Sequence, residues 1–247
     1  MFSFFNKKNN VSDIEWLGVD IHSHLLPAID DGAENILQSV NYIHHLQELG
    51  FSKLICTPHI YSDVYPNTRE TILPALATVT SAVNKGGWSV ELDAAAEYMA
   101  DAEFLATDSL LTLPGNYILI EMSYLSETPN IDAIIFDLQV KGYKVILAHP
   151  ERYNYYHGNI ERYQRFKEMG CFLQLNLLAV LGYYGKSVKA AAEVLLDKNL
   201  YDFAGTDLHH DKHLSMLTSG IRDGVLYKKL GNYGFRNLEE FSSTIKL

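Results

Sequence analysis

The chain has 247 residues, of which 47% are hydrophobic, so it is long enough for one α/β barrel with a sizeable core. It carries 20 Lys and Arg residues against 30 Asp and Glu residues, which gives a formal net charge of −10. An acidic surface repels phosphate backbones, so nucleic acid is excluded as a default partner, and a phosphate ligand needs a locally positive site such as bound metal ions.

The two ends of the chain and its cysteines give expectations about compartment. The apolar run in MFSFFNKKNN is too short for the core of a signal peptide, and no run approaches the ~18 apolar residues of a membrane-spanning helix. We expect residues 1–15 to be a flexible lead-in and residues 16–247 to form one domain. Cys56 and Cys171 lie in apolar runs, and two buried thiols favour a reducing cytoplasm over a disulfide scaffold.

Short apolar runs alternate with helical segments along the whole chain. The predicted strands are WLGVDIH, SKLICTPH, WSVELDAAAE, NYILIEMS, KVILAHPE, CFLQLN and YDFAGTD. Apolar residues that recur every three or four positions predict helices over residues 33–49, 70–84, 131–142, 159–169 and 187–197. Strand–helix alternation of this kind predicts a parallel sheet or barrel. Seven strands favour a single-domain, distorted (β/α)7-like barrel over an eight-stranded one.

Nearly every predicted strand ends in a residue that can bind a metal ion. The carboxyl ends of the strands in an α/β barrel form one rim, where functional groups converge. Side chains that are scattered along the sequence can therefore meet in one pocket. The strand-end residues are His22, His24, His59, Glu97, Glu121, His149, Asp207 and His209.

The stretch DIHSHLLPAIDDG contains the first group of these residues. His22 and His24 are two apart on a strand, so both imidazoles face the same side and can bind one divalent ion. A pair of hydrogen-bonded core histidines is the alternative. Asp30 and Asp31 stand in DDG, which is also good turn chemistry. We expect one of the two acids to reach a metal ion, and the spacing does not choose between them.

Three further candidates follow the next strands. His59 comes just beyond a strand, where a lone histidine is more often structural than functional. Glu97 ends DAAAE, and small residues before an acid suit a crowded barrel mouth, with a solvated loop carboxylate as the alternative. Glu121 follows the run YILI, where a buried carboxylate is costly unless it is paired or metal-bound. We favour a ligand at Glu121.

The fifth and seventh predicted strands provide a cation and another ligand pair. AHPERY places His149 at a strand end and Arg152 three residues later, and a guanidinium holds phosphate oxygens through two parallel hydrogen bonds. A surface salt bridge with Glu151 or Glu161 is the alternative for Arg152. AGTDLHHD contains an Asp-x-His pair on one strand face. Three residues that follow this pair are expected to lie behind the ligands or in solvent. They are His210, Asp211 and His213.

The combined donor set indicates a metal cluster. Nitrogen and oxygen donors together suit Zn, Mn or Fe better than Mg or Ca, which prefer oxygen. Nine ligands exceed what one ion needs, so we expect two or three divalent ions that share bridging carboxylates.

The strings HSH…DDG, TPH, AAEY, IEMS, AHPER and TDLH resemble, in this order, the motif series of the PHP (polymerase and histidinol phosphatase) superfamily. The resemblance is strongest to its CpsB/CapC-type branch, bacterial manganese-dependent protein-tyrosine phosphatases of capsule and exopolysaccharide operons. It runs from about residue 17 to about residue 215. It implies the PHP fold, a (β/α)7-like barrel, with three metal ions, Mn above all, held by His22, His24, Asp31, His59, Glu97, Glu121, His149, Asp207 and His209.

The resemblance also implies roles around the cluster. It selects Asp31 over Asp30 as the ligand and gives Arg152 the role of the arginine that contacts phosphate. Relatives in this branch often carry a second arginine shortly after the Asp-x-His motif, where this chain has Lys212 and His213. A lysine ammonium holds phosphate as a point charge, without the two parallel hydrogen bonds of a guanidinium. This difference from the relatives therefore affects how the substrate is oriented and how fast it reacts.

Two more residues are candidates for substrate binding. Asn176, in a segment similar to one of the family, is expected to face the pocket. Either Tyr61 or Tyr65, from YSDVYP after His59, is a candidate to stack on the ring of the substrate.

The expected reaction is hydrolysis of an aryl phosphate. Water that is activated by the metal ions attacks phosphorus, while the ions and Arg152 stabilise the equatorial oxygens. Phenolate, with a pKa near ~10, leaves more easily than a serine alkoxide. A cysteine phosphatase needs an arginine six positions after its cysteine, where this chain has Ser62 and Leu177, so no phosphocysteine intermediate forms.

We therefore expect a cytoplasmic protein-tyrosine phosphatase. The resemblance implies that its substrate is the Tyr-rich tail of a bacterial tyrosine kinase that controls polysaccharide export. One alternative is a phosphatase of a small phosphomonoester such as histidinol phosphate. Another is a non-catalytic, metal-bound scaffold that binds phosphotyrosine or a kinase, against which the intact ligand set argues. The sequence does not set the oligomeric state and is compatible with an oligomer.

Overall fold

A computed structural model describes residues 11–101, 104 and 110–242. Residues 1–10 of the expected lead-in lie outside the described residues. The lead-in is shorter than expected, because Ile14 is buried in the core and its N–H donates to the Leu49 carbonyl at 2.8 Å. Among the described residues, no helix combines the length and the apolar character that crossing a membrane requires.

The strands form two parallel sheets. One has the order β1-β2-β4, from strands β1 (Val19–Asp20), β2 (Lys53–Cys56) and β4 (Glu91–Ala94). The other has the order β3-β5-β6-β7-β8-β9, from β3 (His59–Ile60), β5 (Glu97–Met99), β6 (Tyr117–Glu121), β7 (Lys144–Ala148), β8 (Phe172–Asn176) and β9 (Phe203–Gly205). The chain passes from β2 into β3, and from β4 into β5, across two residues. The seven predicted strand runs therefore correspond to β1, β2 with β3, β4 with β5, and β6 to β9.

The first strand meets the last one. A parallel bridge joins Ser23 to Leu208, just after β1 and β9. The buried carboxylate of Asp20 accepts hydrogen bonds from the backbone N–H and the hydroxyl of Thr206, at 2.9 and 2.6 Å. These contacts join the two sheets at one edge, so the strands follow one another around a distorted (β/α)7-like barrel.

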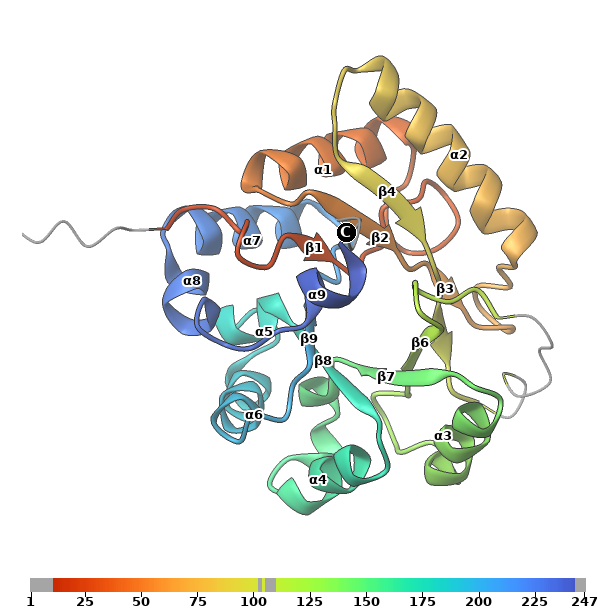
Figure 1. The fold of residues 1–247 in the computed structure, drawn as a ribbon, viewed down its shortest axis with the longest axis vertical. Helices are drawn as coiled ribbons and strands as arrows, with labels where there is room; N and C mark the ends of the chain where they lie inside the picture. The colour runs from red at the N-terminus through yellow and green to blue at the C-terminus, as the bar shows by residue number, and fades with distance from the viewer. Residues whose placement is uncertain (1–10, 102–103, 105–109, 243–247) are drawn as a thin grey trace, which may run out of the picture.

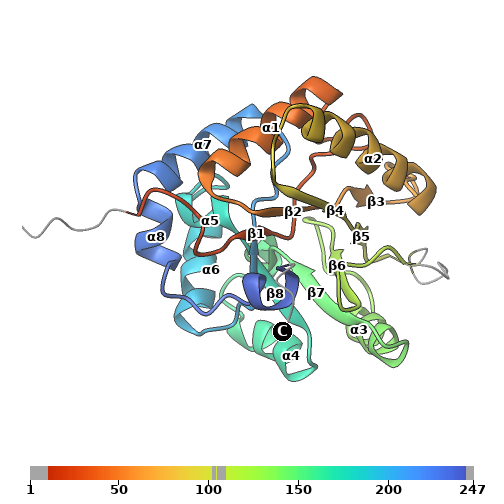
Figure 2. The same ribbon diagram turned by 45° about the horizontal axis from the view of Figure 1, so that its top comes forward.

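Helices surround the strands (Figures 1 and 2). The five predicted helices are found as α1 (Ile36–Leu49), α2 (Arg69–Lys85), α3 (Ile131–Val140), α4 (Ile160–Glu168) and α6 (Lys186–Asp197). Helices that the prediction does not contain are α5 (Leu177–Leu181), α7 (Asp211–Arg222), α8 (Val225–Leu230) and α9 (Asn237–Phe241). Short 3-10 turns cover Pro150–Arg152 and Asn154–Tyr156.

Helix α1 shows how local sequence sets these boundaries. It begins after Asn35, whose side chain accepts the N–H of Gln38 as an N-cap. It ends at Gly50, whose φ of 111° is open to glycine and strained for other residues. Between these signals, one face of the helix packs on the barrel through Tyr42, Ile43, Leu46 and Leu49. Burial of that face, more than helix propensity, holds α1 against the strands.

Candidate metal centre

The predicted ligands converge at the carboxyl ends of the strands. All nine belong to groups whose donor atoms lie within 4.8 Å of one another. One group is buried throughout, and a second group is partly exposed. His59 and Glu97 belong to a third group with Glu121, and each is shared with one of the others. The groups are His22, Glu97, His149 and Asp207; His24, Asp31, His59 and His209; and His59, Glu97 and Glu121.

Glu97 lies at the centre of the cluster. Its fully buried carboxylate is within 3.3 Å of four imidazole nitrogens, on His22, His24, His59 and His149. Its Oε2 atom has no hydrogen-bond partner among the described residues, although it lies 3.2 Å from His22 and His59. An orphaned buried carboxylate oxygen costs free energy unless a cation contacts it. Glu97 therefore fits a carboxylate that bridges metal ions.

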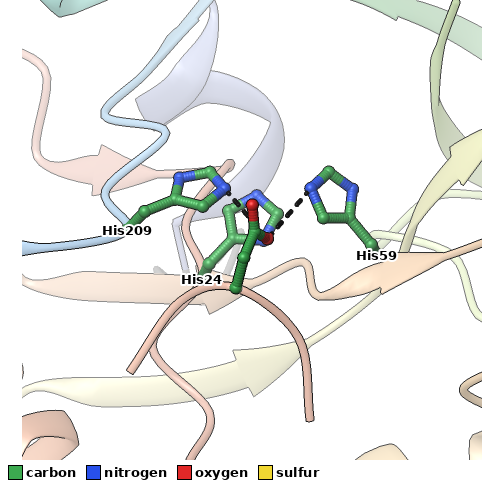
Figure 3. Close-up of side chains that lie close together, drawn as sticks. His24, His59 and His209 are labelled. Carbon is green, nitrogen blue, oxygen red and sulfur yellow. Dashed lines mark ion pairs between the residues drawn. The ribbon is translucent and has the colours of Figure 1, made fainter. Parts of the chain in front are cut away.

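The partly exposed group surrounds His24. Its ring stacks on His209 at a centroid distance of 3.8 Å and lies 4.5 Å from the ring of His59 (Figure 3). Asp31 Oδ1 lies 3.5 Å from His59 Nε2 and 3.6 Å from His209 Nε2, the two ion pairs drawn as dashed lines. The Asp31 side chain is 51% exposed, so it closes this group on the solvent side.

Asp30 has a different role from its neighbour Asp31. Its side chain is fully buried, and its Oδ2 accepts the ring N–H at Nδ1 of His24 at 2.8 Å and the backbone N–H of His59 at 3.1 Å. Its Oδ1 accepts the N–H of Gly32. A Cβ atom at Gly32 would lie 2.1 Å from the His24 carbonyl oxygen, so this approach needs glycine. The structure therefore assigns Asp30 to orienting His24 and puts Asp31 among the donors.

Asp207 connects the cluster to Arg152. Its Oδ1 lies 3.3 Å from His22 Nε2, and its Oδ2 accepts hydrogen bonds from Arg152 at 2.7 Å and from the Asn176 amide at 2.8 Å. Arg152 is thus paired with Asp207 and not with Glu151 or Glu161, the surface partners that the sequence left open. The expectation that Asn176 faces the pocket is corrected as well. Asn176 is fully buried, does not line the cavity, and holds Asp207 in place.

Two supporting residues escaped the sequence analysis. The side-chain oxygen Oε1 of Gln174 accepts the ring N–H at Nδ1 of His22 at 2.9 Å and the backbone N–H of His149 at 3.3 Å. Glu151 is buried and accepts the backbone N–H of Asn176 and the hydroxyl of Tyr201. Gln174 was detectable as a polar residue inside the apolar run CFLQLN. Nothing local in AHPERY marks Glu151 as buried.

A cavity of about 610 Å³ opens over the cluster. Tyr61 lines it, and Tyr65 stacks on the His59 ring at 5.5 Å with an interplanar angle of 14°. His210 and His213 agree with the expectation for them, because His210 is exposed and His213 is buried behind His209, whose backbone N–H it accepts at 3.3 Å. Both also line the cavity. The remaining lining includes Val64, Met99, Met122, Ser123, Tyr124, Leu125, Arg152, Tyr183 and Tyr184, with candidate ligands at the base.

The electrostatics of the cluster favour bound cations. Burial would lower the pKa of His22, but Glu97 and Asp207 outweigh it and raise that pKa to about 9. Burial would raise the pKa of Glu97, but the charges of His22 and His59 hold it well below its usual range. Carboxylates thus draw protons onto the imidazoles, as they would draw divalent ions. The buried Nδ1 of His149 also has no hydrogen-bond partner among the described residues, so the donor set fits metal binding.

Two candidate ligands sit on strained backbone. His149 directly follows β7 and has a φ of 32°. Asp207 lies shortly after β9 and has a φ of 49°. Side chains other than glycine rarely adopt this left-handed region, and such conformations cost about 1–3 kcal/mol each. The surrounding contacts impose a backbone direction that aims both side chains into the cluster.

Comparisons with known proteins give a consistent result. A family model described as "Capsular polysaccharide synthesis, CpsB/CapC" matches residues 18–238. Tyrosine-protein phosphatase YwqE of Bacillus subtilis is 31% identical over 198 residues, 78% of each chain. Tyrosine-protein phosphatase CpsB of Streptococcus pneumoniae is 26% identical over 201 residues, 78% of this chain and 83% of that protein.

Solved structures extend the comparison to the fold. A chain from the crystal structures of YwqE from Bacillus subtilis and CpsB from Streptococcus pneumoniae, described as unique metal-dependent tyrosine phosphatases, matches with a TM-score of 0.75 and 28% identity. The match covers 91% of this chain and 95% of that chain. An amidohydrolase from Mycoplasma synoviae matches with a TM-score of 0.57 at 14% identity, a likeness of fold alone.

Proposed function

This chain belongs to the CpsB/CapC family, and on that basis we propose that it is a metal-dependent protein-tyrosine phosphatase. One observation carries the proposal. Five imidazoles and four carboxylates meet at the base of one cavity, beside a guanidinium that can bind phosphate. The mixed nitrogen and oxygen donors suit Mn, with Fe and Zn as alternatives, and nine donors suit two or three ions.

Each of the three donor groups would hold one ion. His22, Glu97, His149 and Asp207 would hold one ion, His24, Asp31, His59 and His209 a second, and His59, Glu97 and Glu121 a third. When bound, such ions supply positive charge and lower the pKa of water toward neutrality. Their charge also supplies the positive site that phosphate needs on a chain of net charge −10.

Arg152 is the group that we propose for the phosphate itself. One of its amino groups donates to Asp207, which leaves other N–H groups of the guanidinium for phosphate oxygens. Charge on those oxygens redistributes in the transition state, so a fixed guanidinium beside them is catalytic as well as binding. Phenolate departs without strong help from an acid because its pKa is near ~10.

The walls of the cavity suit an aryl phosphate. We propose that Tyr61 contacts the ring of the substrate at the mouth, where Tyr65 is already stacked on His59. Among the described lining residues there is no cysteine. Burial also raises the pKa of Cys171 to about 12, which disfavours a thiolate nucleophile there. These features support a route without a phosphocysteine intermediate.

The cellular setting rests on the family. Its description ties it to capsular polysaccharide synthesis, and the curated relatives carry the name tyrosine-protein phosphatase. We therefore propose a cytoplasmic enzyme that dephosphorylates a tyrosine-phosphorylated protein, namely the tail of a bacterial tyrosine kinase that serves capsule or exopolysaccharide synthesis.

A phosphate-release assay tests the function. Chelated and Mn-reconstituted protein would be compared on a phosphotyrosine peptide, a phosphoserine peptide and histidinol phosphate, with His22→Ala and Arg152→Ala alongside. Metal-dependent release from phosphotyrosine alone, lost in both variants, is the expected result. Preference for histidinol phosphate would replace the proposal with a small-molecule phosphatase. No release from any substrate with metal bound would leave a scaffold.

A further inference from the structure

The guanidinium of Arg152 contacts two tyrosine rings that come from other parts of the chain. Its central carbon is 4.4 Å from the ring centroid of Tyr124, in the loop after β6, and 4.3 Å from that of Tyr184, between α5 and α6. Both rings line the cavity above the donor cluster. We propose that Tyr124 and Tyr184, here called the aromatic clamp, are positioning residues that fix Arg152 at the phosphate subsite. This inference rests on the proposed function.

The geometry of a guanidinium explains why two rings are effective. All five N–H groups of arginine lie in one plane, so its two faces cannot form ordinary hydrogen bonds. Both rings of the aromatic clamp lie within 4.4 Å of the guanidinium carbon, where the ring quadrupoles attract the positive charge. Asp207 takes one in-plane amino group at 2.7 Å. The guanidinium plane and its remaining donors are then fixed before any phosphate arrives.

Each ring of the aromatic clamp contacts a further tyrosine ring. Tyr124 lies 6.1 Å from the ring of Tyr153, which is fully buried and whose hydroxyl accepts the N–H of Met122. Tyr184 meets Tyr183 edge-on at 5.1 Å, and its hydroxyl accepts the amide N–H of Asn176 at 3.0 Å. Tyr184 is therefore anchored by a hydrogen bond, whereas Tyr124, which is 40% exposed, is supported by ring contact. Both can restrain the long side chain that they contact.

Restraint of this one cation matters for the chemistry. Among the described residues that line the cavity, Arg152 is the only lysine or arginine. Lys212, which stands where relatives often have a second arginine, is exposed and is not part of the lining. Freezing an arginine side chain on binding costs conformational entropy, and a preformed position avoids much of that cost. A single guanidinium thus gains phosphate affinity from being held in place.

Binding of inorganic phosphate to the Mn-loaded protein, measured by calorimetry, tests the aromatic clamp without requiring turnover. Tyr124→Leu and Tyr184→Leu should each weaken binding between about twofold and about thirtyfold, the range expected for one cation–π contact. Tyr124→Phe, which keeps the ring, should stay close to wild type. Tyr184→Phe, which keeps the ring but loses the hydrogen bond from Asn176, should fall between wild type and Tyr184→Leu. In an Arg152→Ala background the leucine substitutions should have no further effect. Val140→Ala, at an exposed position outside the cavity lining, is the control.

The outcomes separate the aromatic clamp from other roles. Leucine effects that persist in the Arg152→Ala background, or phenylalanine effects as large as those of leucine, would overturn it. Metal content and thermal midpoints show whether each variant is folded. If a leucine variant fails to fold, phenylalanine of increasing fluorination at position 124 keeps the shape and weakens the quadrupole, and phosphate affinity should fall stepwise. Phosphate binding without phosphotyrosine turnover would refute the enzyme proposal and leave the aromatic clamp standing, whereas absence of phosphate binding would refute the aromatic clamp.

Discussion

Asp30 and Asp31 are adjacent in sequence, and the structure predicts opposite consequences for the same change at each. In Asp30→Asn, an amide NH₂ would face either the N–H of Gly32 or two N–H donors, the ring of His24 and the backbone of His59. In Asp31→Asn, a carboxylate that is 51% exposed loses only its charge. The pair is therefore a matched test of which acid orients a ligand and which acts as one.

The expected loss at Asp30 can be worked out in two ways. Hydrogen bonds to a charged acceptor contribute about 1.5–3 kcal/mol each, so losing one or two predicts roughly 1.5–6 kcal/mol. The pKa of Asp30 is lowered from 3.8 to about 2, because the charges of His24 and His59 outweigh burial. That shift corresponds to about 2 kcal/mol, present above pH ~4 and lost as the pH falls toward ~2. We expect Asp30→Asn to cost about 2–4 kcal/mol in the metal-free protein.

Metal binding should change as well. In the orientation that points the asparagine NH₂ at His24, the Nδ1 atom becomes an acceptor and the ring proton moves to Nε2, the atom that faces Glu97 and Asp207. Loss of such an orienting group typically lowers metal affinity 10–100-fold, by order of magnitude. Asp31→Asn should leave unfolding within about 0.5 kcal/mol of wild type while it weakens binding of one ion.

Urea unfolding at neutral pH in the presence of a chelator measures the stability of both variants, and elemental analysis after dialysis against Mn measures ion content. The reasoning would be refuted if Asp30→Asn matched wild type in stability and metal content. It would also be refuted if Asp31→Asn unfolded the metal-free protein as much as Asp30→Asn does.

Other predictions concern buried groups around the cluster. Burial raises the pKa of Glu151 from 4.5 to about 7, so the metal-free protein should lose up to about 3 kcal/mol as the pH rises through that window. Thermal midpoints of Glu151→Gln should lack that decline. Gln174→Ala frees the His22 ring and should weaken metal binding about tenfold or more, as measured by competition with a chelator. Replacing Cys56 and Cys171 with alanine should leave phosphatase activity within about twofold, and iodoacetamide should not inactivate the wild type; strong inactivation would point to a thiol nucleophile.

Much of this architecture could be predicted from the sequence, because one rule covers both fold and site. Strands of a parallel barrel end at a common rim, so His59 and Glu121, each at a strand end, were expected to meet although 62 positions separate them. The structure brings both into one donor group. Helices α7 to α9 follow the last strand, where no further strand–helix alternation indicated them.

The supporting contacts could not be predicted, because they depend on which strands become neighbours. Gln174 reaches His22 across 152 positions, and nothing in either residue type encodes that distance. Asn176 lies two residues beyond Gln174 on β8, and its amide is taken up by Asp207 and Tyr184, both supplied by other segments. Residue type was enough to identify the ligands. The polar residues that hydrogen-bond to these ligands are set by burial and by which strands are neighbours.

The contact between the first and last strands sets the order of events during synthesis. Asp20 and Thr206 meet across 186 positions, and the donor groups combine His22 and His24 with Asp207 and His209. The N-terminal histidines leave the ribosome long before their partners exist, so an incomplete chain carries only scattered donors. Contacts at such separation form late because loop closure must come first. Tight metal uptake during refolding should therefore follow barrel assembly and report that the whole chain has folded.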